Sequence, residues 1–315
     1  MPLFTQDIDL FQRYVGATIA DFTVKNVLPD LETAEETLLV RFLGEAVAAQ
    51  IIAFASQTLD PTSPAHKLPI RAVHLARTAV GKIGFAGAMV MSEVQIGDDG
   101  ITVTATEGRK AAFEYQTNKL ERTLLDAGWR GLDQLISLVA ANTTLFTAWD
   151  DSPYYTEHQT ALIATPAQFS RWYPIQDRWL TFWALRPFLR AVESGRSLPL
   201  RDAITAASLP TGAATRALDA LHQATCLQTV VEAIPHLSVE INGAQVQLNY
   251  AGQYQNNKYH QPPGREQLDW LLQTIGRQAQ TAWDTAELVI APVPSAGTDS
   301  VASGPITSTP NFIAI

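Results

Sequence analysis

The feature that most constrains the fold of this chain is an internal repeat spanning most of its length. An aromatic residue, an arginine and a second aromatic residue open two similar stretches, which begin at Phe11 and at Phe169. A proline follows at the same distance in both stretches, at Pro29 and at Pro187. Because further matches keep the same order along the chain, the sequence predicts a tandem duplication of one folding unit.

A second doubled feature is a pair of hairpin signals. The stretches VQIGDDGITVT (94–104) and VEINGAQVQLN (239–249) each place a short turn between alternating apolar residues. An Asn-Gly pair in that setting suits the positive φ angles of a tight turn, so we expect two β-hairpins. Their tips are candidate contact residues, which are Gly97, Asp98, Asp99 and Gly100 in the first hairpin and Asn242 and Gly243 in the second.

Helical periodicity dominates the remainder of the chain. Residues 32–57 are rich in helix formers, with Gly44 as the expected break. Residues 59–69 contain three prolines and predict a loop, which a further helix should follow over about 70–91. Three- and four-residue steps then separate Leu120, Leu124, Gly128, Leu132, Leu135 and Val139, which is typical of one face of a helix or of two consecutive helices.

The predicted fold class is therefore mainly α (α+β), with two tandem helical bundles that each carry one β-hairpin and an extended C-terminal arm. The first repeat is expected over 1–150 and the second over 151–288. The boundary is placed at the turn-forming residues DDSPYY, 150–155.

The predicted arm, residues 289–315, has a composition unlike the rest of the chain. Thirteen of its 27 residues are Pro, Gly, Ser or Thr, and Asp299 is its one charged residue. Such a segment cannot build a core of its own. Its end is nevertheless apolar, so Phe312, Ile313 and Ile315 are expected to dock on another subunit. One way for the arm to dock is to add a strand to the exposed edge of a sheet.

Bulk composition narrows the functional classes. A net charge of −9 argues against a general nucleic-acid-binding protein, although DNA could pass through a negatively lined channel. The chain has a single cysteine, Cys226, so an intramolecular disulfide is excluded and a reducing compartment fits. Cys226 itself is expected to be a small core residue. The N-terminus lacks the pattern of a signal peptide, and no stretch has the roughly twenty apolar residues of a membrane span.

No residue pattern specifies a reaction, a metal site or a cofactor. The six histidines show no zinc-ligand spacing. The nearest approach to a metal cluster is Asp150, Asp151, Glu157 and His158, for which turn and helix-cap roles suffice. We therefore expect neither an enzyme nor a cofactor.

Two other patterns have structural explanations. Gly81, Gly84 and Gly87 lack the spacing and the lysine of a phosphate-binding loop, so they indicate close helix packing. Glu35 and Glu36 point in different directions on a helix and are expected on a solvated face.

The tryptophans allow a structural and a functional interpretation. Trp149 and Trp283 lie in the tetrapeptide TAWD, which occurs twice, and are expected to be packing anchors that close each bundle. Trp172, Trp179 and Trp183 have helical spacing typical of a core. The alternative is an enzyme or ligand-binding helical protein whose pocket lies between the two halves and is lined by these three aromatic residues.

The segment from VQIGDDGI through EGRKAAFEYQTNKLERTLLDAGWRGLDQLISLV to FTAWDDSPYYTEHQTALIATPAQFSRWYPIQDRWLTFWALRPFLRAVE resembles a family of phage- and prophage-encoded proteins of unknown function. Each predicted half is also similar in outline to the head–tail connector (neck or adaptor) proteins of tailed phages. Those proteins form rings beneath the portal, and the duplication departs from their single-domain form.

The resemblance implies a structural subunit of the virion neck that assembles in the host cytoplasm as a homo-oligomeric ring. Its implied partners are other copies of itself, the portal and other neck or tail proteins, with DNA passing through the channel without sequence-specific binding and with no membrane. The remaining structural alternative is a tail-side component such as a terminator or baseplate subunit.

Overall fold

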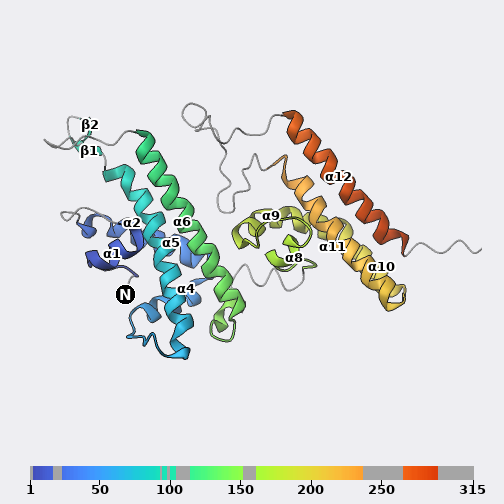
Figure 1. Cartoon of the computed structure of the whole chain (residues 1–315), viewed down its shortest axis with the longest axis horizontal. Helices are drawn as coiled ribbons and strands as arrows, with labels where there is room; N and C mark the ends of the chain where they lie inside the picture. The colour runs from blue at the N-terminus through green and yellow to red at the C-terminus, as the bar shows by residue number, and fades with distance from the viewer. Residues whose placement is uncertain are drawn as a thin grey trace, which may run out of the picture.

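The computed structural model describes residues 3–16, 23–92, 94–97, 100–103, 114–151, 161–236 and 265–289. These residues form two helical units that follow one another along the chain (Figure 1). Each unit is organised around two long helices that lie side by side, and shorter helices cover one side of that pair.

The first unit is built on the pair α5 and α6. Its elements are α1 (Ile8–Val15), η1 (Val24–Asn26), α2 (Leu28–Glu35), the π-helical turn η2 (Glu36–Val40), α3 (Arg41–Leu43), α4 (Glu45–Ala55), η3 (Pro64–His66), α5 (Lys67–Ser92), α6 (Glu114–Ala141) and η4 (Thr147–Asp151). Gly44 has a φ of 83° and separates α3 from α4, which confirms the predicted helix break. The predicted 70–91 helix is α5, which begins three residues earlier.

The second unit is built on the pair α11 and α12. Its elements are α8 (Pro166–Ser170), α9 (Trp179–Val192), the π-helical turn η5 (Glu193–Ser197), α10 (Leu198–Ala206), α11 (Thr211–Ala233) and α12 (Arg265–Leu288). Thr165 and Gln168 form a capping box that starts α8. Pro187 lies within α9, one turn and a half before η5.

Buried positions recur at constant offsets in the two units. Residues of α2 correspond to residues of α9 that are 158 positions later in the chain, as buried Leu31 and Leu189 do. The two π-helical turns follow at nearly the same offset. Residues of α5 and α11 match at 145. The buried pairs there are Ala72 with Ala217, Leu75 with Ala220, Ala76 with Leu221, Ala79 with Ala224 and Val80 with Thr225. These offsets support a duplicated origin, which stays a prediction.

The α6 and α12 helices match at an offset of 147, and this corrects one sequence alignment. The buried pairs are Leu132 with Ala279, Leu135 with Ala282, Ile136 with Trp283 and Val139 with Ala286. Trp283 therefore corresponds to Ile136, while Trp149 lies in η4 after the end of α6. Both tryptophans are fully buried, but the two TAWD tetrapeptides occupy different local structures because α12 continues as a helix where the first unit turns back.

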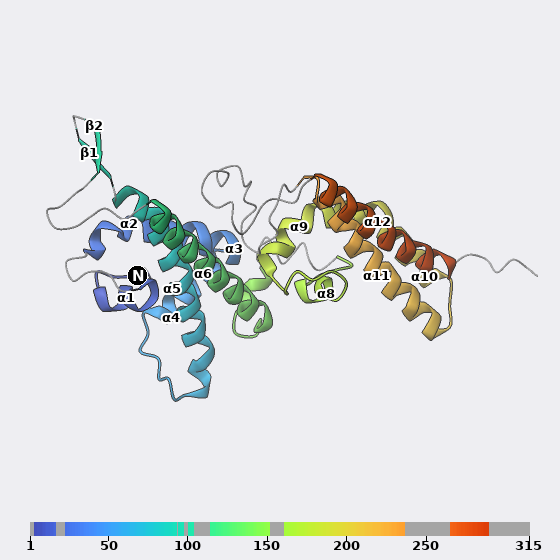
Figure 2. The ribbon, with the colours of Figure 1, turned by 45° about the horizontal axis from the view of Figure 1, so that its top comes forward.

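The predicted mainly α character is confirmed, but the α+β class with a hairpin as part of each bundle is wrong. The described residues include one two-stranded antiparallel ribbon of four residues a strand, β1 (Val94–Gly97) and β2 (Gly100–Val103). It projects beyond the end of α5 and adds no layer to either helical unit (Figure 2). The second predicted hairpin, 239–249, lies outside the described residues. Helix packing alone organises both units.

Close helix packing explains two of the three α5 glycines, as the sequence predicted. A Cβ atom added at Gly81 would lie 2.8 Å from Cζ of Phe4, and one at Gly84 would lie 3.0 Å from Cδ2 of Leu31. Gly87 is different, because no other atom lies within 4 Å of its added Cβ. The N-terminal segment and α2 can thus approach α5 more closely than a side chain would allow.

Candidate functional site

The structure tests few of the contact residues predicted from the sequence. Gly97 and Gly100 are paired opposite each other at the end of the ribbon that is farther from α5 along both strands. The others lie outside the described residues: Asp98, Asp99, Asn242, Gly243, Phe312, Ile313 and Ile315. The hypothesis that the hairpin tips and the arm make contacts therefore stays a prediction.

The two units meet at a joint that the sequence did not predict. Asp133 of α6 accepts a hydrogen bond from the backbone N–H of Leu180 at 3.1 Å. Leu180 lies in the first turn of α9, where the preceding residue Arg178 supplies no side-chain cap. An aspartate from the first unit thus caps a helix of the second. Burial raises the pKa of Asp133, although the backbone N–H groups of Leu180 and Trp179 oppose that shift.

Aromatic side chains fill the same joint. The rings of Phe42 and Trp183 are stacked, with centroids 5.9 Å apart and an interplanar angle of 4°. Trp129 meets the same Phe42 ring edge-on, at 6.3 Å between the ring centroids. Trp179 and Trp183 pack against the hydrophobic cores of both units. The aromatic surface that could have lined a ligand pocket is therefore in contact with a side chain from the first unit.

A half-buried carboxylate fastens the start of the first unit. Glu35 Oε2 accepts a hydrogen bond from the backbone N–H of Leu3 at 2.7 Å, and Arg77 Nε donates to the carbonyl oxygen of Leu3 at 3.0 Å. The backbone N–H and C=O of Leu3, which is fully buried, are thus both hydrogen-bonded to side chains. Burial raises the pKa of Glu35 more strongly than the Leu3 hydrogen bond lowers it. The predicted solvated face is wrong for Glu35, while Glu36 is exposed.

A similar clamp recurs at the start of the second unit. Glu193 Oε1 accepts from the backbone N–H of Ile163 at 3.0 Å, and Arg186 Nη1 donates to the Ile163 carbonyl at 3.2 Å. Glu193 corresponds to Glu35 at the offset of 158, but Arg186 lies on α9 and Arg77 lies on α5. Burial raises the pKa of Glu193, against the opposing effect of the Ile163 hydrogen bond and of the Arg186 charge.

The outward side of α12 is apolar at both of its ends. Trp270 is 64% exposed and Leu288 is 72% exposed. They are eighteen residues apart, which is about five helical turns, so they lie on the same side of the helix. The inward side, with Ala279, Ala282 and Ala286, packs toward α11. Exposed tryptophan is the residue type most enriched at binding hot spots, so this side of α12 is a candidate interaction surface.

Titratable side chains elsewhere do not form a reactive group. Cys226 is buried, and burial together with the Glu193 charge raises the pKa of its thiol, which keeps the thiol protonated. Burial lowers the pKa of His222. Among the described residues, no three histidine, cysteine or carboxylate side chains gather as they would to hold a metal ion. Of the predicted metal candidates, Asp150 and Asp151 lie in η4, and Glu157 and His158 lie outside the described residues.

The length and apolar character of the described helices bear on membrane insertion. No helix within the described ranges combines the length and the apolar character needed to span a bilayer.

Comparisons with known proteins give one match. Residues 39–159 match the profile of a family of unknown function, DUF6712. The matched region begins in η2 and covers α4, α5, the ribbon and α6, so it omits α1 and the whole second unit. The searches of curated proteins and of solved structures returned no significant match. The family match carries no information about phage origin or a neck location.

Proposed function

We propose that this chain is a structural subunit of a tailed-phage or phage-derived neck, functioning as a head–tail connector ring below the portal. The observation that carries the proposal is the outward side of α12, where Trp270 and Leu288 are the most exposed large apolar residues in the described part of the chain. Single exposed apolar residues are common. Trp270 and Leu288 share one side of α12 about 27 Å apart, so a partner that lies along this helix would contact both.

The position of this surface supports an assembly role. Leu288 is the last residue of α12, and the predicted arm begins at the next residue. The arm contains one charged residue, and it ends in Phe312, Ile313 and Ile315. A helix side with exposed apolar residues at its two ends, followed directly by an arm whose own end is apolar, suits contacts between neighbouring subunits. Rings require such heterologous contacts, which close by rotation.

Removing the two apolar parts separately tests the proposal. Trp270→Ala and deletion of 305–315 should each reduce assembly of the purified chain, as measured by light scattering and electron microscopy. Circular dichroism should show that both variants keep their helices, because Trp270 is exposed and the composition of the predicted arm cannot build a core. Leu120→Ala, at a 49% exposed position on α6, is the matched control and should assemble normally. Normal assembly of both test variants would refute the proposal.

A further inference from the structure

The helix α5 is basic throughout, in a chain whose net charge is −9. It contains Lys67, Arg71, Arg77 and Lys82 and no aspartate or glutamate, so its four cations give a net charge of +4. One of these cations has a structural role, because Arg77 donates to the Leu3 carbonyl oxygen and its Cζ lies 5.9 Å from the centre of the Tyr14 ring. The other three cations lie elsewhere on the helix.

These three cations share one side of α5 with two further polar residues. Steps of three and four residues separate Lys67, Arg71, His74, Thr78 and Lys82, so they lie within about 80° around the helix axis. We call these residues the basic stripe. Lys67, Arg71 and His74 are exposed, and Thr78 and Lys82 are half-buried. At a rise of about 1.5 Å per residue, the stripe is about 22 Å long.

The elements that border the stripe do not neutralise it. The His74 ring lies beside Tyr14 of α1, with 5.3 Å between the ring centroids. Gly131 of α6 packs against the middle of the stripe, where an added Cβ would lie 3.2 Å from Cγ2 of Thr78. The α6 residues one helical turn on either side of Gly131 carry no charge. The described part of the chain provides no ion-pair partner for Lys67, Arg71 or Lys82.

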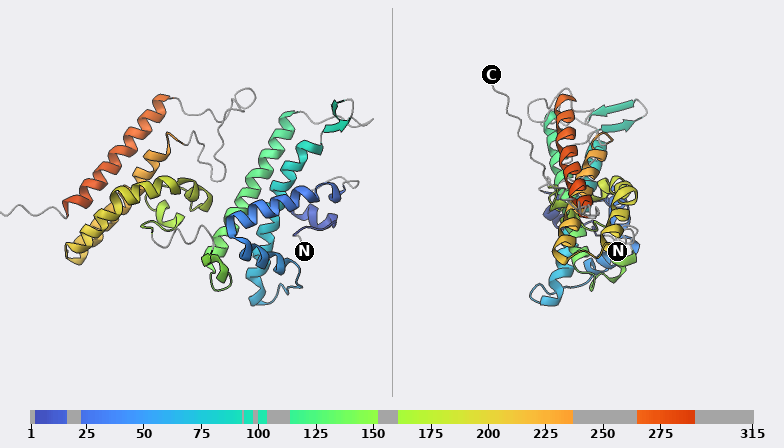
Figure 3. Two further views of the ribbon diagram at one scale, coloured as in Figure 1. Left: turned by 180° about the vertical axis from the view of Figure 1, so that it is seen from behind. Right: turned by 90° about the vertical axis from the view of Figure 1, so that its right-hand side faces the viewer.

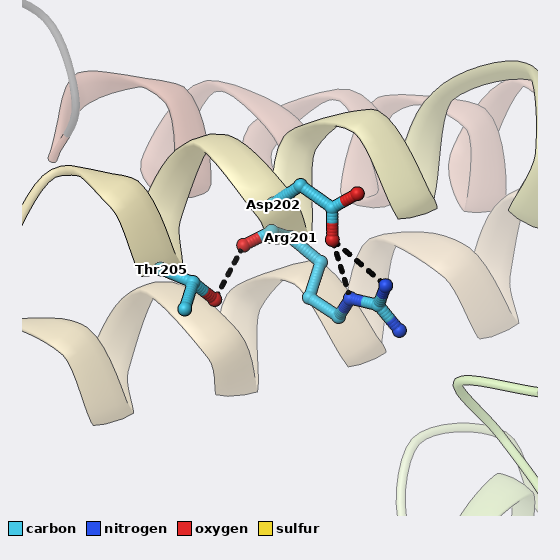
Figure 4. A network of polar contacts seen from close by, with 3 residues as sticks. All are labelled: Arg201, Asp202 and Thr205. Atoms are coloured by element: carbon cyan, nitrogen blue, oxygen red, sulfur yellow. Dashed lines mark hydrogen bonds and ion pairs between the residues drawn. The ribbon is translucent and has the colours of Figure 1, made fainter.

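Two partly exposed arginines of the second unit differ in this respect. Arg201 donates from Nε and Nη2 to one oxygen of Asp202, at 3.0 and 2.7 Å (Figure 4). Arg196 contacts Glu287 of α12 at 2.8 Å. The charge of each arginine is thus matched by a carboxylate of the same unit, whereas the charge of the stripe is left for another molecule.

The corresponding helix of the second unit lacks the stripe. The helices α5 and α11 each run beside the other long helix of their unit, α6 or α12 (left panel of Figure 3). At the offset of 145, the stripe positions on α11 are Gly212, Arg216, Asp219, Gln223 and Leu227. With one arginine and two carboxylates, α11 has a net charge of −1. Packing of the long helix pair therefore does not require the cations of the stripe, which indicates a contact outside the chain.

We propose that the basic stripe contacts the phosphate backbone of double-stranded DNA without reading its sequence. Duplex DNA carries one negative charge per about 1.7 Å of its axis, so a row of cations about 22 Å long meets a continuous line of phosphates. The stripe contains no apolar residue, whereas the centre of a protein–protein interface is apolar and depleted in charge. The choice of duplex DNA rests on the proposed neck function, in which DNA passes every subunit of the ring.

The acidic remainder of the chain keeps this contact weak and dependent on salt. Each neutralised phosphate lowers the slope of log K against log salt by about 0.9, so with three cations the affinity falls about 40-fold between about 50 and 200 mM salt. A contact of this kind holds DNA without fixing its register, and it allows the DNA to slide along the protein.

Charge reversal at the start of the stripe tests the contact. The variant Lys67→Glu with Arg71→Glu should bind a fluorescently labelled duplex at least about tenfold more weakly at low salt, as measured by fluorescence anisotropy. One stripe cation remains in this variant, so its affinity should fall only about threefold over the same range of salt. Two duplexes of unrelated sequence should bind the natural chain equally.

A matched control separates the stripe from total charge. Lys25→Glu with Arg216→Glu makes the same change in net charge at two exposed positions outside the stripe, and Arg216 corresponds to Arg71. The control should bind DNA within about twofold of the natural chain. Circular dichroism should show unchanged helix content in both variants, because all four substituted residues are exposed.

Three outcomes would overturn the inference. They are a natural chain without salt-dependent binding, equal weakening in the test and control variants, and displacement of DNA by poly-glutamate as effectively as by unlabelled duplex at equal charge. The last outcome would assign the stripe to an acidic polypeptide. Rings that form from a chain that does not bind DNA would overturn the contact and leave the neck function standing. Stripe-dependent DNA binding by a chain that never forms a ring would do the opposite.

Discussion

The starts of the two units are fastened by the same kind of clamp, built from different arginines. In the first unit Glu35 holds the N–H of Leu3, and the arginine that holds its carbonyl comes from α5. In the second unit Glu193 at the start of η5 holds the N–H of Ile163, and the arginine comes from α9, the helix that leads directly into η5. The glutamate is the constant part of the clamp and the arginine is the variable part.

Burial differs between the clamps as well. Glu193 is 4% exposed and Arg186 is also buried, whereas Glu35 is only half-buried. A buried charge that loses its partner has no water to replace it. The comparison teaches that equivalent side chains can have unequal energetic roles when their surroundings change.

Removing each glutamate should produce the largest and most unequal effects. Glu193→Ala leaves the Ile163 N–H buried without its acceptor and removes the carboxylate charge that acts on the buried Arg186, so we expect a loss of about 3–5 kcal/mol in the free energy of unfolding. Glu35→Ala should cost about 1–3 kcal/mol, because water can reach the Leu3 N–H. Urea unfolding measures both. Equal losses in the two variants would contradict the expected difference between the clamps. The control Glu36→Ala, at an exposed neighbouring position, should change the free energy of unfolding little.

Acidic pH should favour the folded state at the same site, by a smaller amount. The folded-state pKa of Glu193 is raised above its ordinary 4.5, so the stabilisation from proton binding is present below pH 4.5 and is lost as the pH rises through the folded value. The natural chain should therefore gain stability relative to Glu193→Gln on going from pH 7 toward 4.5, since glutamine does not titrate. Thermal unfolding across this range checks the sign, and an opposite trend would show that the carboxylate is stabilised in its charged form.

The joint between the two units should contribute moderately to the free energy of unfolding. Asp133→Ala removes the cap that the first unit provides to α9, and we expect a loss of about 1 kcal/mol. Hydrogen exchange should quicken at the start of α9 and leave α11 unchanged. Asp126→Ala, at an exposed position on the same helix, is the control. Unchanged exchange in α9 would mean that the cap does not hold the units together.

Two glycines should give the smallest effects, in the stabilising direction. Gly87 in α5 and Gly276 in α12 have no atom within 4 Å of an added Cβ, so alanine should raise the unfolding free energy by about 0.5–1 kcal/mol at each. Gly81→Ala should instead destabilise the first unit, since its Cβ would meet Phe4 at 2.8 Å. Differential scanning calorimetry distinguishes the signs, and stabilisation by Gly81→Ala would contradict the close packing.

Local features of the fold were predictable from the sequence, and distant contacts were not. The break at Gly44 and the helix after residue 69 follow from glycine, proline and helix-forming residues that act within a few positions. The Glu35 clamp joins residues 32 and 74 positions apart, so no spacing reveals it. The stacking of Phe42 on Trp183 likewise joins the two units, and helical spacing of the tryptophans indicated burial without naming a partner.

The two identical TAWD tetrapeptides do not occupy corresponding positions in the two units, for a physical reason. The two TAWD tetrapeptides share letters, but burial in α12 follows the helical period and aligns Trp283 with Ile136. A helix side is set by which residues face the neighbouring helix, and identical letters outside that period do not preserve it. The TAWD match therefore indicates kinship less reliably than the buried positions do.

The mass of the purified full-length chain in solution, measured by native mass spectrometry, tests the central claim most directly. A structural subunit of a neck ring should give one closed oligomer of defined stoichiometry, and Trp270→Ala should shift it toward smaller species. A chain that remains monomeric at every concentration, with and without Trp270, would contradict the account.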